Sequence, residues 1–252
     1  MRLSVIIFVF LSYSLQADVI QVAVGDWCPY VCNPEREQGR QGYIPELLQQ
    51  VFEAHQHRIE FKVIPFGRAI QLARTGKIHA HSGLYRSDAP DLIFPSIPQG
   101  VSTNYFFLHK DRVWEYRDEA SLLQLKDLGL MQDFTYEKEI EIFRRRHSNR
   151  IIFLSGDKPL LRYFQMMAKH RIYAIYEDRW VGNYYLKSLG LKQLIREAGS
   201  IGIKNQVFVA FSPKIPESKA YAKILADGIN YLRQSGKLKV ILDEYGMQDW
   251  VE

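Results

Sequence analysis

An order of strand, helix, strand, helix and strand runs through the first third of the chain and starts again in the middle. In the first unit, apolar runs predict strands at 20–24, 59–64 and 78–82. Apolar residues at helical spacing predict helices at 44–54 and 66–75. Parallel strands joined by helices form right-handed crossovers, so this unit is expected to be a largely parallel sheet covered by helices.

The second unit repeats this order after residue 127. Its strands and helices alternate and are predicted at 128–131, 136–145, 151–154, 159–169, 172–176 and 179–189. Two strand-like segments, 102–111 and 206–211, join the units as paired crossings. Terminal helices at 220–232 and 238–245 are expected to pack on one of the two sheets. The chain therefore predicts a two-lobed α/β protein with two hinge strands.

This architecture places loops from both sheets opposite each other. In open α/β folds, ligands usually bind outside the carboxyl ends of the strands. Closure of the two lobes about the hinge strands would trap a small solute there. The predicted division is a leader at 1–17, a first lobe at 18–107 and 206–252, and a second lobe at 108–205.

The first 17 residues predict a secretory signal. A positive start at Met1 and Arg2 precedes the apolar run 5–11, and Leu15-Gln16-Ala17 matches a small-residue cleavage site. The alternative is a membrane anchor, but the apolar stretch is shorter than the roughly 20 residues that a spanning helix needs. The mature protein is expected to begin at Asp18 and to be soluble and exported.

Charge and composition narrow the function classes. The hydrophobic share of 47% can supply a large core, which excludes a disordered or fibrous protein. Lys and Arg number 33 against 28 Asp and Glu, and the basic residues are scattered, with 144–146 as the longest run. A nucleic-acid-binding protein would need a basic face, so no nucleic-acid partner is expected.

The two cysteines, Cys28 and Cys32, follow the first predicted strand. In an oxidising compartment, two nearby thiols form a disulfide if their Cα atoms lie within about 6.8 Å. A redox pair is the alternative, but three residues separate the thiols rather than two. A zinc site lacks enough neighbouring ligands. We therefore predict a disulfide that braces the loop after the first strand.

Six short motifs occur in an order and spacing that suggest a family. They are WCPY at 27–30, GYIPELL at 42–48, PFGRA at 65–69, GKIHA at 76–80, LIFP at 92–95 and AIYED at 174–178. With them, residues 20–246 resemble the bacterial extracellular solute-binding proteins of family 3, which are amino-acid-type receptors of ABC importers. The resemblance implies the type II periplasmic-binding-protein fold, a periplasmic location, a small-molecule ligand and a transient partner in a membrane ABC permease.

The resemblance also implies an arginine that holds a ligand carboxylate. The family commonly places this Arg shortly before the strand that corresponds to 92–95, near Asp88 in this chain. This sequence departs from the pattern, because the nearest Arg is Arg86. Arg86 as a solvated loop charge is the alternative. Arg68 is a second anion-ligand candidate, because a cation at a helix start needs a compensating partner, and an ion pair between helices is its alternative.

On the same resemblance, Asp178 is expected to bind the amine of the ligand, because it follows the strand 172–176. The alternative is an N-cap for the helix that begins at Arg179.

Further lining candidates come from loops after strands. Trp27 and Tyr30 are expected to form an aromatic wall and Tyr85 to cover the ligand, with core packing as the alternative. Ser82 and Thr135 are expected to donate hydrogen bonds to a carboxylate, as are the backbone N–H groups of 134–136.

No metal or cofactor is expected. His79 and His81 share a strand face, which suggests a metal site, but that face is predicted to lie under a helix.

The sequence thus predicts a monomeric periplasmic receptor for a small polar, amino-acid-like ligand, without catalytic activity. One alternative is a dehydratase-type enzyme on the same fold, with Glu177 or Asp178 as general acid. The other is a stand-alone chemosensory binding protein. Sequence does not separate sensing from transport, because both need the same binding and closure.

Overall fold

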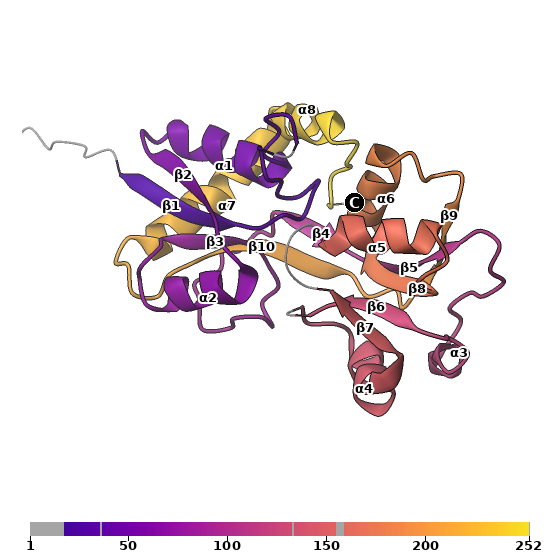
Figure 1. The fold of residues 1–252 in the computed structure, drawn as a ribbon. Helices are drawn as coiled ribbons and strands as arrows, with labels where there is room; N and C mark the ends of the chain where they lie inside the picture. Colours follow the sequence, from indigo (N-terminus) through magenta and orange to yellow (C-terminus); the bar gives the residue numbers. More distant parts are fainter. Residues whose placement is uncertain (1–17, 36, 133, 155–158, 252) are drawn as a thin grey trace, which may run out of the picture.

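The computed structural model describes residues 18–35, 37–132, 134–154 and 159–251. The predicted signal at 1–17 lies outside these residues. Figure 1 shows two lobes side by side, each built on one sheet with helices against it, which confirms the predicted fold class. Among the residues described, no helix is long and apolar enough to cross a membrane.

The first lobe contains a five-stranded sheet in the order β2-β1-β3-β10-β4. Its strands are β1 (Val19–Val24), β2 (Arg58–Val63), β3 (Ala80–Leu84), β4 (Gly100–Ser102) and β10 (Asn205–Phe211). The strand β1 pairs in parallel with β2 and β3, whereas β10 runs antiparallel to β3 and β4. The sheet is therefore parallel in the βαβ part and antiparallel where the chain returns from the other lobe.

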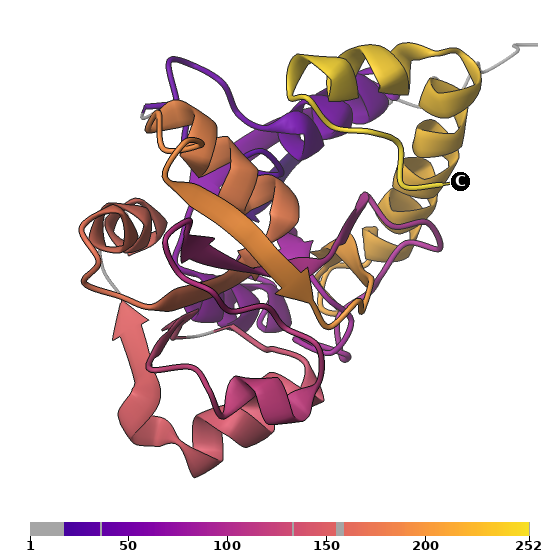
Figure 2. The ribbon, with the colours of Figure 1, turned by 90° about the vertical axis from the view of Figure 1, so that its right-hand side faces the viewer.

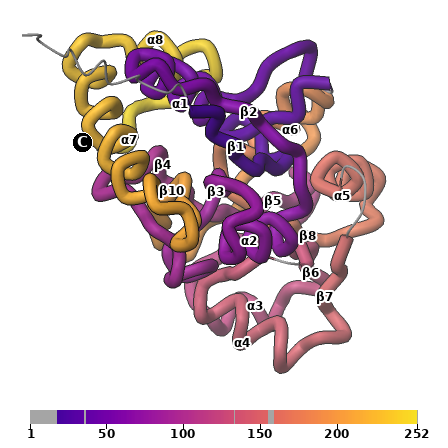
Figure 3. The backbone as a smooth tube through the Cα atoms, turned by 90° about the vertical axis from the view of Figure 1, so that its left-hand side faces the viewer, coloured from indigo at the N-terminus to yellow at the C-terminus, as the bar shows by residue number. Residues whose placement is uncertain are grey.

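The helices of the first lobe are α1 (Tyr43–Glu53), α2 (Phe66–Arg74), α7 (Ser218–Gln234) and α8 (Lys237–Glu244). Apolar residues at helical spacing bury one face of α1, including Leu47, Leu48 and Phe52. Figures 2 and 3 show α8 alongside α1, so the terminal helices belong to the first lobe. A Cβ at Gly228 of α7 would lie 2.4 Å from Val51 Cγ1, and glycine therefore allows α7 to approach α1.

The second lobe has the sheet order β7-β6-β8-β5-β9. Its strands are β5 (Asn104–His109), β6 (Leu128–Met131), β7 (Ile151–Leu154), β8 (Ala174–Asp178) and β9 (Ile195–Ser200). The strands β7, β6 and β8 are parallel, and β5 is antiparallel to both of its neighbours. The helical segments are α3 (Glu119–Leu122), α4 (Lys138–Arg146), η1 (Ser148–Arg150), α5 (Pro159–Ala168) and α6 (Arg179–Ser188).

The chain crosses between the lobes twice. The first crossing is Thr103, between β4 in one sheet and β5 in the other. The second comprises residues 201–204, between β9 and β10. Residues 104–107 therefore lie in the second sheet, although the predicted lobe boundary at 107 placed them in the first lobe. Most of the predicted segments 102–111 and 206–211 belongs to the sheets, in β4, β5 and β10, so the crossings themselves are short.

Candidate functional site

A cavity of about 410 Å³ lies between the two sheets. The first lobe lines it with residues in or just after the carboxyl-terminal parts of β1, β2 and β3, including Asp26, Val63 and Ser82. The second lobe contributes described residues of the loop after β6, the end of β7, the start of α5 and the end of β8. The cavity is therefore at the carboxyl ends of parallel strands from both lobes, as the strand order predicts.

Glu177 is the buried carboxylate of the cavity wall in the second lobe. It is 3% exposed, and its Oε1 accepts hydrogen bonds from Trp27 Nε1 at 3.2 Å and from the Asp178 backbone N–H at 2.9 Å. Burial raises the pKa of Glu177 to about 8. The charge of the neighbouring Asp178 acts in the same direction, and the two hydrogen bonds oppose the shift. A group with this pKa is mostly protonated at neutral pH when the cavity holds no cation.

Asp178 is fully buried and does not line the cavity. Its Oδ1 accepts from the N–H groups of Trp180 and Val181, at 2.8 and 3.0 Å, which makes it the N-cap of α6. Its Oδ2 accepts from Ser102 Oγ at 2.8 Å, the Thr103 N–H at 3.0 Å and Tyr30 OH at 3.2 Å. Asp178, which the sequence predicted to bind the amine of the ligand, therefore lies at the first crossing and accepts these five hydrogen bonds from protein groups.

The alternation of β8 explains why Glu177 and not Asp178 reaches the cavity. Ala174 and Tyr176 pack in one apolar core cluster, and Ile175 packs in another. Glu177 shares the face of Ile175, because side chains two residues apart lie on the same side of a strand. The two-residue period was the sequence signal that could have separated Glu177 from Asp178.

Trp27 lines the cavity at 9% exposure, and Tyr30 stacks behind it with ring centroids 4.2 Å apart. Tyr30 is fully buried and lies outside the lining. Of the two rings predicted to form an aromatic wall, Trp27 therefore lines the cavity and Tyr30 packs behind it. Tyr85 lines the cavity, and its OH donates to Ser102 Oγ at 2.9 Å.

The predicted disulfide between Cys28 and Cys32 is confirmed, with a Cα–Cα distance of 4.7 Å. Inside this loop the Trp27 N–H donates to the Val31 carbonyl at 2.7 Å, and the reverse bond measures 3.1 Å. The disulfide and the backbone pair together fix the short segment that carries Trp27 and Tyr30.

Both arginine candidates lie outside the cavity lining. The guanidinium of Arg86 lies over the rings of Phe94 and Phe208, 4.9 and 4.4 Å from their centroids, and its Nη2 donates to the Pro95 carbonyl at 3.0 Å. Arg68 is exposed in the first turn of α2. Among the described residues that line the cavity, none is a Lys or Arg.

Asp88 lines the cavity in the first lobe, and its Oδ2 accepts from the Tyr85 N–H at 2.7 Å. Burial raises the pKa of Asp88, and hydrogen bonds from Tyr85 and Thr135 oppose this shift. Thr135 also lines the cavity, from the second lobe, so its bond to Asp88 joins the two lobes. The predicted donor Thr135 therefore serves a protein carboxylate in this structure.

Two buried polar groups of β3 face the cavity. Ser82 is 3% exposed, and its Oγ has no hydrogen-bond partner among the described residues. His81 is 1% exposed, its Nδ1 lies 3.3 Å from the Ala23 carbonyl, and its Nε2 is unpartnered within the described part of the chain. Burial lowers the pKa of His81 to about 4, so its imidazole is neutral at neutral pH.

The histidines do not form the metal site that their alternation suggested. His79 Nδ1 accepts from the Gln21 N–H at 3.1 Å, whereas His81 faces the cavity. A different group, His109, Asp111 and His170, brings potential ligand atoms within 4.8 Å of one another. That group lies at the end of β5, which His109 terminates, and outside the cavity lining.

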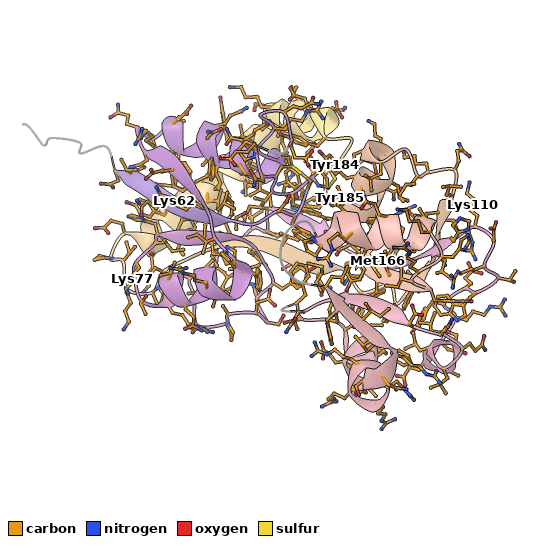
Figure 4. The ribbon with its side chains drawn as sticks, in the orientation of Figure 1. Lys62, Lys77, Lys110, Met166, Tyr184 and Tyr185 are labelled. Atoms are coloured by element: carbon orange, nitrogen blue, oxygen red, sulfur yellow. A yellow bond between two sulfur atoms is a disulfide. The ribbon has the colours of Figure 1, made fainter. Side chains whose placement is uncertain are left out.

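Further contacts connect the lobes around the cavity. The rings of Phe66 and Phe134 lie 5.7 Å apart, and both line the cavity. Tyr184 of α6, labelled in Figure 4, donates to the Glu37 carboxylate of the first lobe. With the Trp27–Glu177 bond, these contacts show the two lobes closed on the cavity.

No protein-family model and no curated protein matches the chain. Solved structures do match. A protein from a study of glutathione import through GshT and the cystine ABC importer TcyBC of Streptococcus mutans has a TM-score of 0.75 at 15% identity, covering 91% of this chain and 95% of that one. A histidine kinase sensor domain similar to periplasmic binding proteins has a TM-score of 0.74 at 15% identity, with coverages of 92% and 98%.

An ancestral amino-acid-binding protein described as a precursor of cyclohexadienyl dehydratase also matches, with a TM-score of 0.69 at 14% identity and coverages of 90% and 95%. At these identities the likeness establishes the fold, which is that of the two-lobed binding proteins. The matched proteins are described in terms of import, sensing and a precursor of an enzyme, so the fold alone does not assign the activity.

Proposed function

We propose that the protein is a periplasmic solute-binding protein that captures a small molecule between its lobes and delivers it to a membrane ABC importer. The single observation that carries the proposal is the cavity of about 410 Å³ whose walls come from both lobes. Two short crossings connect those lobes, so that a bound solute can stabilise the closed arrangement. The fold shared with binding proteins of known importers supports the same conclusion.

Native mass spectrometry of gently purified protein tests this function first. A receptor that binds tightly retains its solute, so we expect a 1:1 complex whose added mass is lost on denaturation. A thermal-shift screen of small solutes follows, because a ligand that binds only the folded state raises Tm. A protein that retains no small molecule and is stabilised by none of a broad panel would contradict the receptor function.

The periplasmic location rests on the predicted signal at 1–17. We expect protein taken from the periplasm to have the mass of a chain that begins at Asp18. Protein that keeps Met1 in the cytoplasm would contradict export, without bearing on the cavity.

One observation favours a second function, an enzyme on the same fold. Glu177 lies in a closed cavity and burial raises its pKa to about 8, which suits a general acid. Incubation with prephenate or arogenate, followed by NMR, distinguishes the two functions. A binding protein leaves both compounds unchanged, whereas turnover that Glu177→Gln abolishes would establish the dehydratase.

A further inference from the structure

We propose that the solute is an organic cation with an apolar or aromatic body and no carboxylate that needs a basic partner. This inference rests on the proposed receptor function and names its ligand class. The cavity supplies carboxylates and aromatic faces from both lobes.

The first argument is charge. Three carboxylate side chains line the cavity, those of Asp26, Asp88 and Glu177, and the described lining contains no Lys or Arg. The one described histidine of the lining, His81, is neutral because burial lowers its pKa to about 4. Among the lining residues that the structure describes, a ligand carboxylate would lose its hydration without gaining a cationic partner, whereas an ammonium group would gain one or more anionic partners.

The second argument is the position of the arginines. The guanidinium of Arg86 is held over Phe94 and Phe208 and by the Pro95 carbonyl. Its charge is therefore directed to partners within the first lobe and outside the cavity. The group that would bind the carboxylate of an amino acid is thus separated from the cavity, although the sequence contains it.

The third argument is the shape of the apolar surface. Trp27, Phe66 and Tyr85 line the cavity from the first lobe, and Phe134 and Tyr136 line it from the second. Aromatic faces attract cations and also bury apolar carbon, so rings beside carboxylates suit an amine that carries an apolar body. The aromatic residues of the two lobes meet at the cavity, where the ring centroids of Phe66 and Phe134 lie 5.7 Å apart.

Glu177 is the central counter-charge of this proposal. Its Oε1 accepts a hydrogen bond from Trp27 Nε1 of the opposite lobe, so the carboxylate and the largest ring of the cavity wall meet between the lobes. A cation near Glu177 favours its ionised form, and binding then releases a proton. Ser82 Oγ, which has no partner among the described residues, lies on the other wall and can accept a hydrogen bond from the same ammonium group.

Two matched sets of probes test the ligand class by isothermal titration calorimetry. The first is phenethylamine, 2-phenylethanol and phenylalanine, and the second is tryptamine, tryptophol and tryptophan. Within each set the aromatic ring and the two-carbon chain are the same. The amine carries a positive charge, the alcohol is neutral, and the amino acid carries a carboxylate in addition to its ammonium group. We expect the amines to bind at least about tenfold more tightly than the alcohols or amino acids, because charge-assisted bonds to a buried carboxylate exceed neutral ones.

Glu177→Gln tests the counter-charge, since glutamine keeps an oxygen acceptor for Trp27 Nε1 and removes the charge. We expect it to weaken tryptamine binding at least about tenfold and tryptophol binding by less than about twofold. Asp88→Asn is a second variant at a less buried carboxylate, with the same direction expected. Asp243→Asn is the matched control, because Asp243 pairs with Lys239 on α8 outside the cavity.

The outcomes separate the two proposals. If phenylalanine or tryptophan binds as tightly as its amine, the cationic ligand class is wrong and the receptor function stands. If no amine binds at millimolar concentration, the ligand class is also wrong, and the native-mass and solute screens decide the receptor function alone. If Glu177→Gln and Asp88→Asn bind tryptamine like the parent, the carboxylates are not its counter-charges and the proposal fails.

Discussion

Two adjacent acidic residues at the end of β8 have different structural roles. Asp178 caps α6 and holds the first crossing, and Glu177 faces the cavity. Burial raises the pKa of both, to about 6 and about 8. The sequence could predict that a carboxylate at the end of this strand lines the site. Which of the two residues does so depends on which face of the strand meets the opposite lobe.

Asp178→Ala is expected to lower the free energy of unfolding by about 3 kcal/mol. The substitution removes the cap of α6 and leaves the buried Ser102 hydroxyl and Thr103 N–H without their acceptor. Urea denaturation of the ligand-free protein measures the change. The control Asp243→Asn should change stability by less than about 0.5 kcal/mol, since its ion pair is exposed. An equally small effect for Asp178→Ala would contradict the structural role.

The contribution of Glu177 to the stability of the ligand-free protein is expected to fall as pH rises from about 4.5 to about 8. The folded pKa of Glu177 is raised above its ordinary value of 4.5, so in this window the folded state binds more protons than the unfolded state. The stabilising contribution is complete below 4.5 and is lost as pH rises through 8, with a slope of up to about 1.4 kcal/mol per pH unit.

Glu177→Gln should reduce this pH slope, and urea denaturation at pH 5, 6.5 and 8 measures it in both proteins. The titratable groups that face Glu177 are Asp178 on its own strand and, across the cavity, Asp26, His81, Tyr85 and Asp88, with Tyr136 beside it in the second lobe. His81 is neutral in the folded state, whereas its ordinary pKa is 6.5, so it adds an opposing slope between about pH 4 and 6.5. This slope is common to the parent and to Glu177→Gln and cancels in their comparison. An unchanged slope in the variant would show that another group titrates.

At the scale of elements, the long periodic segments were predictable. Apolar residues recur at helical spacing in α1, α5 and α7, and they form short continuous runs in β6 and β7. Such patterns can be read from neighbouring residues alone. The short β4 and α3 and the edge strand β9 were not predicted, because three or four residues carry little periodicity and β9 has few apolar residues. Partners far along the chain define those elements, as in the pairing of β4 with β10.

Helix α6 depends on a glycine where it packs on β5. A Cβ at Gly182 would lie 2.1 Å from Cζ of Phe107, inside the core of the second lobe. Gly182→Ala is therefore expected to destabilise the protein by about 1–3 kcal/mol through overpacking. Gly67→Ala in α2 is the matched control, because a Cβ there meets no atom within 4 Å, and it should be neutral or slightly stabilising. Thermal denaturation compares the two, and equal Tm values would contradict the packing described for α6.

At the scale of the whole molecule, the site exists only when the lobes meet. Trp27 and Glu177, which come from different lobes and lie 150 residues apart, share a hydrogen bond. The sequence predicted two lobes, two crossings and several lining residues, among them Trp27, Ser82 and Tyr85. It could not predict that Arg86 is held by Phe94 and Phe208, because that stacking joins β10 to a loop far away in the sequence.

Small-angle X-ray scattering with tryptamine at a concentration that saturates the calorimetric titration tests most directly whether the lobes close on an organic cation. The account predicts a smaller radius of gyration with tryptamine than without it, no contraction with tryptophol at the same concentration, and loss of the tryptamine effect in Glu177→Gln. A radius of gyration that stays unchanged at saturation would contradict closure on the ligand.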